Sequence, residues 1–331
     1  MNHLKQSAGP DIVPLIDLSD FHTPDGRAKI SKEIRAACLS VGFFGIKEHG
    51  VSKEICDNAN AASRRYFALP KAERMKDLID DRFRRGYMPT IDGPRAVVES
   101  YELSLDLPLE DPDVVAGHFL HGPNRWPENH PWFRAAIEPY LEAMLALGER
   151  LERLFALSLG LEEYYFVELC KKPIFHMRVL HYLPQTEEEK KTHMATGAHS
   201  DYGMHTILMP DLNGGLELQL RSGEWIKAPC VEGTFVINVG DMLELWTNDL
   251  YVSTPHRVIG LTGRDRYSIP AFFSPAFDTV VECIPSCLVP GEKPKFVPLK
   301  AGEYLTRRMS LETQEDKGGY DAVGGHRKAA Y

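Results

Sequence analysis

In the first half of the chain, short continuous apolar runs alternate with segments in which apolar residues recur every three to four positions. The runs IVPLIDLS and FFGIKEHGV are typical of short strands, and the segment AKISKEIRAACLSVG between them places its apolar residues on one helical face. A second helix is expected at about 52–69, and the longest helical pattern covers about 132–161. Pro139 lies inside that pattern, so the helix is either kinked there or begins near it.

The pattern changes after Pro173. Short apolar runs such as FHMRVLHYL, HTILMP, LELQLRSGEWIKAP, TFVINVGDMLELW, YVSTPHRVI and RYSIPAFFSP follow one another at short intervals, separated by Gly, Pro, Asn and Asp. This spacing favours an antiparallel β-sandwich or barrel. The earlier run SYELSLDLPL alternates like a half-buried strand, and the charged segment QTEEEKKTHMATG is expected to be an exposed loop.

These patterns predict one compact α+β unit with four parts. They are a mixed N-terminal region at 1–110, a helical scaffold at 111–172, a β core at 173–285 and a C-terminal segment at 286–331. The polar, Gly-rich end of the last segment either closes over the site as a lid or is partly disordered.

Composition excludes several classes of protein. The chain is 43% hydrophobic and 26% charged, has no apolar run long enough to cross a membrane, and begins without a secretory pattern, so we expect a soluble cytoplasmic protein. A formal net charge of -9 disfavours binding to nucleic acid or anionic lipid. Six scattered cysteines without a C-x-x-C pair indicate packing rather than disulfides or a zinc knuckle.

The segment TGAHSDYGMHTIL places polar groups in what is otherwise an apolar strand pattern. His199 and Asp201 are two residues apart, so in a strand both would lie on one face and grip one metal ion. An isolated H-x-D is more often a histidine with an ordinary polar partner. A third group, His256, stands in the run YVSTPHRVIG, which could pair back beside the first two. Two histidines and one carboxylate suit a non-haem Fe(II) site, although catalytic zinc accepts the same ligands.

A second pair follows in RDRYSIPAFF, where Arg266 and Ser268 are again two residues apart. A guanidinium binds a carboxylate through two hydrogen bonds, and a neighbouring hydroxyl adds a third. A lone arginine is more often a surface charge, but this position after His256 predicts an anchor for a dicarboxylic cosubstrate.

These motifs resemble one known family. HSD, STPHRV and RYS, in this order and spacing, are similar to the isopenicillin N synthase-like branch of the Fe(II)/2-oxoglutarate-dependent dioxygenases. VPLIDLS, GFFGIKEHGV, LHGPNRWP and INVGDMLELWTND also resemble that branch, so the similarity covers most of residues 12–280.

The resemblance implies a distorted double-stranded β-helix, or jelly roll, flanked by helices. It implies that His199, Asp201 and His256 bind Fe(II), and that Arg266 and Ser268 bind the far carboxylate of 2-oxoglutarate. RVLHYLP is similar to the segment that carries a further carboxylate-binding tyrosine, here Tyr182. At Leu180 and Leu183 the plant relatives often have Asn and Pro instead.

The implied activity uses O2 and 2-oxoglutarate, with ascorbate as a stimulant, and releases succinate and CO2. A small molecule, either a secondary metabolite or an amino acid derivative, would be hydroxylated, desaturated or cyclised. Phe272 should face inward near it, and Arg84, Arg85 and Tyr87 in RFRRGYMPT either contact the substrate or are a solvated loop.

The remaining histidines are not expected to bind metal. If the strand after Asp201 continues, His205 points inward but lies too far along to be a ligand. We expect it to be buried and hydrogen-bonded rather than in contact with the substrate. His176, His181 and His193 fit neither the register nor the motif.

Other functions stay open at this point. They are an isopenicillin N synthase-like oxidase that uses no 2-oxoglutarate, a noncatalytic cupin-type binding protein, and a zinc hydrolase. A nicotinamide dehydrogenase and a P-loop enzyme are disfavoured because neither glycine-rich motif occurs. The chain is expected to be a monomer or a homodimer.

Overall fold

Two facing β-sheets form the centre of the protein. The computed structural model describes residues 12–90, 97–192, 195–261 and 263–315. In this part of the chain the longer sheet has the strand order β1-β2-β10-β7-β12-β5-β4-β3, and only the pair β1 and β2 is parallel. Its strands are β1 (Leu15–Asp17), β2 (Phe43–Lys47), β10 (Phe235–Val239), β7 (His205–Met209), β12 (Arg266–Ser274), β5 (Ile174–Tyr182), β4 (Val98–Leu103) and β3 (Gly86–Met88).

The second sheet is smaller and antiparallel. Its order is β6 (Thr196–His199), β11 (His256–Val258), β8 (Leu216–Gln219) and β9 (Trp225–Lys227). A hydrophobic cluster between the sheets joins the two, with Leu180 and Val236 of the longer sheet packed against Leu218 and Ile226 of the smaller one. The expected jelly-roll sandwich with flanking helices is confirmed.

Strand alternation gives the longer sheet two distinct faces. On β5, Leu180 and Tyr182 belong to the cluster between the sheets, whereas Val179 belongs to the larger core on the opposite side. On β12, Phe273 also belongs to that larger core. We call the side of the longer sheet that faces the smaller sheet the inner face, and the opposite side the helix face.

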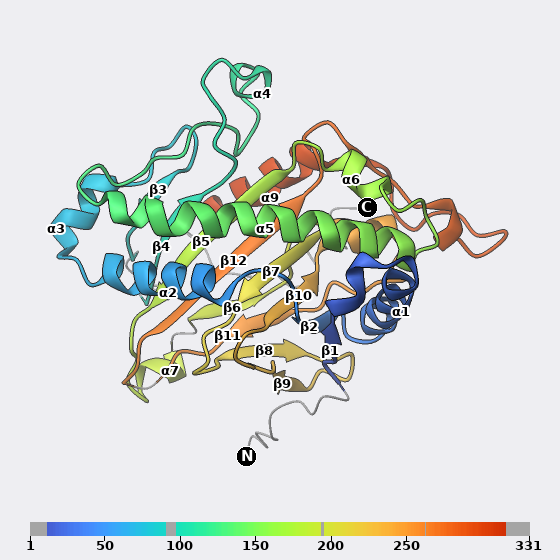
Figure 1. Ribbon diagram of the computed structural model, residues 1–331, viewed down its shortest axis with the longest axis horizontal. Coiled ribbons are helices and arrows are strands. Elements are labelled where there is room, and N and C mark those ends of the chain that lie inside the picture. Colours follow the sequence, from blue (N-terminus) through green and yellow to red (C-terminus); the bar gives the residue numbers. More distant parts are fainter. Residues whose placement is uncertain (1–11, 91–96, 193–194, 262, 316–331) are drawn as a thin grey trace.

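Three long helices cover the helix face. They are α1 (Pro24–Ser40), α2 (Lys53–Phe67) and α5 (Pro131–Ser158), and α5 runs across the sheet with α1 and α2 packed beside it (Figure 1). N-capping side chains fix where α1 and α2 begin. The hydroxyl of Thr23 accepts a hydrogen bond from Gly26 N, and that of Ser52 accepts one from Ile55 N. The helix α5 begins at Pro131 and continues through Pro139, so a start near Pro139 is wrong.

Short elements complete the described chain. They are η1 (Ser19–His22), α3 (Lys71–Arg74), η2 (Met75–Asp77), α4 (Pro112–Val115), α6 (Tyr165–Leu169), α7 (Glu189–Thr192), α8 (Asp241–Trp246), β13 (Val280–Val281), η3 (Pro285–Cys287), β14 (Leu299–Lys300) and α9 (Ala301–Glu315).

Four local expectations are corrected by the structure. The apolar run after β10 is the buried helix α8 rather than strand. The charged loop contains the helical turn α7, and the C-terminal segment contains the helix α9. Strand β4 is buried on both faces rather than half-buried, because Tyr101 and Leu103 enter the larger core while Glu99 and Glu102 pair with side chains of β5. The segment 286–331 was expected to be a lid or a partly disordered tail, and its part at 316–331 lies outside the described residues.

No helix among the described residues combines the length and the apolar character that a membrane crossing requires.

Candidate metal and cosubstrate site

The three metal-ligand candidates meet where the smaller sheet faces the longer one. His199 ends β6 and His256 begins β11, and the two are directly paired across these antiparallel strands. Asp201 Oδ1 lies 3.8 Å from His199 Nε2 and 3.6 Å from His256 Nε2. One ligand atom from each residue lies within 4.8 Å of the others, so the three can share a single ion.

Asp201 reaches this point from a loop rather than from a strand. Strand β6 ends at His199, so the expected common strand face of His199 and Asp201 is wrong although the two do meet. The loop is held by a 2.7 Å hydrogen bond from Asp241 N to Asp201 O. It also passes close to Gly240, where a Cβ would lie 2.3 Å from the Gly203 carbonyl oxygen.

The two oxygens of the Asp201 carboxylate have different partners. Oδ2 accepts hydrogen bonds from Thr206 Oγ1 at 2.5 Å and from Asn238 Nδ2 at 2.7 Å. Oδ1 faces the two imidazoles. The sequence reasoning missed both donors, which come from β7 and β10 and fix which oxygen is presented to an ion.

Backbone carbonyls set the orientation of both imidazoles. His199 Nδ1 lies 2.9 Å from Gly197 O, and His256 Nδ1 lies 3.1 Å from Thr254 O. Because a carbonyl oxygen only accepts, each Nδ1–H donates and Nε2 faces Asp201. Once Nε2 gives up its proton, this orientation is the one that a histidine needs to bind a metal.

The charges within the site stabilise one another. Burial raises the pKa of Asp201, but the positive charge of His256 and His199 and the hydrogen bonds lower it by more, so its pKa lies well below the usual range. Burial lowers the pKa of His256, and the Asp201 carboxylate raises it above its ordinary value. A divalent cation would take the place of those protons, and the two nitrogens and one oxygen suit Fe(II).

Arg266 lies on the inner face with its charge buried. The residue is 2% exposed, its Nε donates to Gly214 O at 2.8 Å, and its Nη1 donates to Ser268 Oγ at 3.0 Å. Among the described residues, no carboxylate oxygen comes within ion-pair distance of its guanidinium. A buried guanidinium without a counter-ion is unfavourable, so this geometry favours an anionic ligand.

Tyr182 completes the same end of the site. It is paired with Arg266 across β5 and β12, and the guanidinium lies 4.7 Å from the centroid of its ring. Its hydroxyl accepts a long hydrogen bond of 3.4 Å from Thr196 Oγ1 on β6, the strand that ends in His199. Tyr182 on the longer sheet is thus in contact with β6 of the smaller sheet, the strand that carries His199.

The candidates for substrate contact separate into two groups. Phe272 is on the inner face, and its partner across β12 and β7 is Thr206, which holds Asp201. Arg85 is fully buried and donates to the carbonyls of Phe83 and Leu120, so it is neither a solvated residue nor available to a substrate.

Tyr87 and Arg84 also do not join the site. The hydroxyl of Tyr87 donates to Glu99, and its ring packs near Tyr66 of α2 on the helix face. Arg84 is half-buried with a φ of 57° in the preceding turn. Both Arg85 and Tyr87 are buried and make hydrogen bonds within the fold, so the structure gives no support to their predicted contact with a substrate.

His205 is buried, as expected, and is not part of the three-residue metal group, but the expected hydrogen bond and inward direction are wrong. It begins β7, faces the helix face and stacks on Phe273 with ring centroids 4.6 Å apart. Neither ring nitrogen has a hydrogen-bond partner in the described part of the chain, and burial lowers its pKa to about 3. The strand breaks between Asp201 and His205, so the inward-facing residue is Thr206.

Two histidines that the metal motif excluded have other roles, and His193 lies outside the described residues. His181 Nδ1 pairs with Glu99 and its Nε2 with Asp265, each at 2.8 Å, on the helix face behind Tyr182 and Arg266. His176 pairs with Glu102 at 2.6 Å on the inner face.

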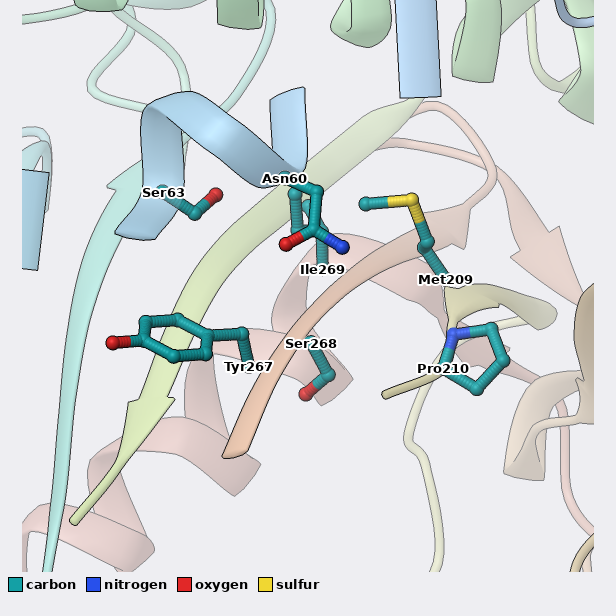
Figure 2. Close-up of a pocket in the computed structure, with 7 residues that line it drawn as sticks. All are labelled: Asn60, Ser63, Met209, Pro210, Tyr267, Ser268 and Ile269. Carbon is teal, nitrogen blue, oxygen red and sulfur yellow. The ribbon is translucent and has the colours of Figure 1, made fainter. Parts of the chain in front are cut away.

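A small pocket lies on the other side of β12. Figure 2 shows it between α2 and the strand, with the hydroxyl of Ser268 pointing away from α2. It is lined by Asn60, Ser63, Met209, Pro210, Tyr267, Ser268 and Ile269. It contains none of the three metal-ligand candidates, so we do not assign chemistry to it.

Family models match both halves of the chain. Residues 13–129 match the model described as non-haem dioxygenase in morphine synthesis N-terminal, and residues 174–275 match the 2OG-Fe(II) oxygenase superfamily. The chain is 36% identical over 304 residues to the 2-oxoglutarate-Fe(II) type oxidoreductase hxnY of Emericella nidulans, covering 88% of this chain and 87% of that protein. It is 35% identical over 271 residues to the 2-oxoglutarate-dependent dioxygenase caaD of Aspergillus niger, covering 79% of this chain and 84% of that protein.

Solved structures give the same result. A full-length Neurospora crassa protein in complex with alpha-KG and thymine superposes with a TM-score of 0.80 at 26% identity, covering 93% of this chain and 100% of that one. The dioxygenase for auxin oxidation in rice superposes with a TM-score of 0.72 at 27% identity, covering 91% of this chain and 96% of that one.

Proposed function

Since the chain belongs to the 2OG-Fe(II) oxygenase superfamily, and is therefore an Fe(II)- and 2-oxoglutarate-dependent dioxygenase, we propose which of its residues perform that activity and on what. His199, Asp201 and His256 hold Fe(II), while Arg266, Ser268 and Tyr182 hold the far carboxylate of 2-oxoglutarate. Oxidative decarboxylation of 2-oxoglutarate to succinate and CO2 is coupled to oxidation of a C–H bond of a small molecule, with hydroxylation as the default outcome.

The buried guanidinium of Arg266 carries this assignment. Its Nε and Nη1 are oriented by Gly214 O and Ser268 Oγ, and no carboxylate of the described residues neutralises it. A dicarboxylic cosubstrate would supply the missing negative charge, through one or two charge-assisted hydrogen bonds. An apolar or cationic ligand would leave the charge uncompensated.

The metal ligands are prepared for a single geometry. Asp201 offers Oδ1, because Thr206 and Asn238 occupy Oδ2, and each imidazole offers Nε2, because a backbone carbonyl occupies Nδ1. Three protein ligands on one side leave the remaining positions for the keto acid and O2. Bound Fe(II) supplies the redox chemistry that activates O2, and the protein residues position it.

Apolar side chains surround part of the proposed site. The cluster between the sheets places the side chains of Phe43, Leu216, Leu218 and Val258 around the two strands that carry the histidines. Phe43 contacts His256 edge to face, with ring centroids 5.4 Å apart. A dry wall of this kind strengthens the electrostatic contacts of Arg266 and Asp201.

The substrate is proposed to be a small organic compound. The Neurospora crassa structure holds thymine, and the rice protein is named a dioxygenase for auxin oxidation; both chains are covered almost completely by this one. We infer for this chain a compound of similar size that lies against Phe272. This residue is the cross-strand neighbour of Thr206, which donates a hydrogen bond to Asp201. A secondary metabolite or an amino acid derivative fits this description.

The remaining assignments rest on sequence properties. The net charge of -9 supports small-molecule rather than nucleic-acid partners. We propose a cytoplasmic enzyme, monomeric or homodimeric, in which the β core at 173–285 carries the chemistry and the segments 1–110, 111–172 and 286–331 support it.

The decisive experiment measures succinate. The protein is loaded with Fe(II) and incubated with 2-oxoglutarate, O2 and a panel of small metabolites, and His199→Ala serves as the control. Succinate release that one metabolite stimulates, and that the variant lacks, is the expected result. Oxygen consumption without succinate would point instead to an oxidase that uses no 2-oxoglutarate, and no redox turnover with any metabolite would contradict the assignment.

A further inference from the structure

Asp241 is a buried acid beside the metal site that does not belong to the proposed ligands. It begins helix α8, is 0% exposed, and donates a hydrogen bond from its backbone N–H to Asp201 O. Both oxygens of its side chain accept hydrogen bonds, Oδ1 from the hydroxyl of Ser253 at 2.7 Å and Oδ2 from the hydroxyl of Tyr304 at 3.2 Å. Because a buried carboxylate needs such partners, this side chain ties together the segments that supply them.

The hydrogen bond from Ser253 connects Asp241 to the segment that orients His256. Ser253 is buried three residues before His256, and between them Thr254 O accepts the hydrogen bond from Nδ1–H of that histidine at 3.1 Å. The backbone N–H of Ser253 also donates to Glu244 Oε1 at 3.1 Å. Two side chains of α8 therefore hold the segment that sets the direction of the His256 ring.

The hydrogen bond from Tyr304 connects Asp241 to the C-terminal helix α9. Burial and Asp241 raise the pKa of Tyr304 well above its ordinary value, so the hydroxyl keeps its proton and donates to the carboxylate. Arg308 lies four residues further along the same helix, with its guanidinium 4.4 Å from the centroid of the Tyr202 ring. Since Tyr202 directly follows Asp201, α9 contacts both the metal loop and the residue that holds this loop.

Other contacts fix the position of α9. Gly302 N donates to Phe277 O at 2.9 Å, and a Cβ at Gly302 would lie 2.3 Å from a ring atom of Phe277, so the helix packs closely there. Leu305 is buried in the larger core. The helix therefore stays attached without the hydroxyl of Tyr304, and removal of that hydroxyl tests only its contact with Asp241.

We propose that Asp241 and Tyr304 are positioning residues for the metal site, and that the C-terminal helix thereby contributes to the affinity for the ion. Asp241 joins the loop that carries Asp201 to the segment before His256, and Tyr304 fixes the carboxylate that makes this link. Neither residue binds the ion. A link between two ligands raises metal affinity because it holds them near their bound arrangement before the ion arrives. Both roles rest on the proposed function, since they require that the three ligands hold an ion.

The test measures the dissociation constant of Co(II), a stable substitute for Fe(II), by competition with a chelator on the full-length protein. Tyr304→Phe removes one hydroxyl and is expected to weaken Co(II) binding about 2- to 10-fold. Asp241→Asn is expected to weaken it about 10- to 100-fold, because an amide has one accepting oxygen and leaves one of the two hydroxyls without its acceptor. The free energy of unfolding of each metal-free variant is measured in parallel.

Two comparisons separate positioning from general destabilisation. Tyr101→Phe is the matched control, because it also removes a hydrogen bond of a buried tyrosine, the one from its hydroxyl to Arg125 O. This control should lower the free energy of unfolding but leave the Co(II) affinity unchanged. Tyr304→Phe should weaken Co(II) binding less in the Asp241→Asn background than in the wild type, because the hydroxyl acts through that carboxylate.

The outcomes are distinguishable. If the wild-type protein binds Co(II) no more tightly than His199→Ala, the proposed function fails. If the wild type binds Co(II) but Tyr304→Phe loses no more affinity than Tyr101→Phe, the positioning role is overturned while the proposed function stands. Equal effects of Tyr304→Phe in the two backgrounds would also overturn it, because the hydroxyl would not act through Asp241. Should Asp241→Asn fail to fold, the comparison of the two tyrosine variants decides alone.

Discussion

Asn238 Nδ2 donates a 2.7 Å hydrogen bond to the Oδ2 atom of Asp201. Asn238 is buried in the apolar strand β10, two strands away from Arg266 in the longer sheet, and Thr206 of the neighbouring strand binds the same oxygen. The carboxylate is therefore oriented before any ion binds, with Oδ1 directed at His199 and His256. This preorganisation explains why a polar amide is retained inside the core.

Replacing this donor should weaken the metal site without removing a ligand. Asn238→Ala is expected to lower the affinity for Fe(II), or for Co(II) as a stable substitute, by about 10- to 100-fold, because Asp201 loses one of its two positioning hydrogen bonds. Metal affinity is measured anaerobically by competition with a chelator. Asn58→Ala on the exposed face of α2 is the matched control. If Asn238→Ala binds the metal as tightly as Asn58→Ala does, Asn238 does not act through Asp201.

The second prediction concerns the anchor for 2-oxoglutarate. Arg266→Ala should weaken 2-oxoglutarate binding by about 1.5–3 kcal/mol, the value of a lost charge-assisted hydrogen bond, and leave metal affinity unchanged. Arg266→Lys should recover only part of the loss, because an ammonium cannot bind in the two-pronged manner of a guanidinium. The dissociation constant of 2-oxoglutarate is compared with that of Arg264→Ala, an exposed arginine in the same segment. A normal constant in Arg266→Ala would assign the anchor to another residue.

The third prediction separates His205 from the metal site. Its two ring nitrogens have no partner in the described chain, so His205→Leu should raise the free energy of unfolding by about 1–2 kcal/mol at neutral pH. Metal affinity should not change. Since burial lowers its pKa to about 3, the folded state resists protonation, and wild-type stability should fall as the pH drops below the ordinary histidine value. Denaturant unfolding of both proteins should show that the variant loses less of its free energy of unfolding at acid pH than the wild type. Loss of metal binding in the variant would mean that His205 contributes to the metal site.

The fourth prediction concerns a buried carboxyl group on α5. Burial raises the pKa of Glu152 to about 8, with Cys170 beside it, so the folded protein holds this group protonated at neutral pH. The unfolded chain releases that proton at a lower pH, so this group lowers the free energy of unfolding as the pH rises from about 5 to about 8. Glu152→Gln should remove that slope and stabilise the protein by about 1–3 kcal/mol near pH 8. Denaturant titrations across this range test it, and an unchanged slope would mean that the group is already ionised in the folded protein.

The sequence predicts which residues form the site better than it predicts how they are arranged in space. The residue types and order identified His199, Asp201 and His256, and strand alternation identified Arg266 with Ser268, which do lie on one strand. The same alternation was wrong for His199 and Asp201, because β6 ends between them. The ligands meet through cross-strand pairing and a loop, which depend on tertiary contacts.

Residues that support the site were hidden for a related reason. Asn238 is a single polar residue in the apolar strand β10, and its partner Asp201 comes from a loop that is distant in the sequence. A polar residue inside FVINV was a usable signal, since such a group needs a partner when buried. Helix α8 was interpreted as strand because it follows the apolar run TFVINV directly, and its six residues are too few to show a helical period.

The central claim is that His199, Asp201 and His256 hold Fe(II) while Arg266 holds 2-oxoglutarate in the same cavity. Anaerobic addition of Fe(II) and 2-oxoglutarate to the purified protein, followed by visible absorption spectroscopy, tests it most directly. The wild-type protein should develop the weak charge-transfer band of the chelate, His256→Ala should not, and Arg266→Ala should need a higher concentration of 2-oxoglutarate. Absence of the band in metal-loaded wild-type protein, or its persistence in His256→Ala, would contradict the account.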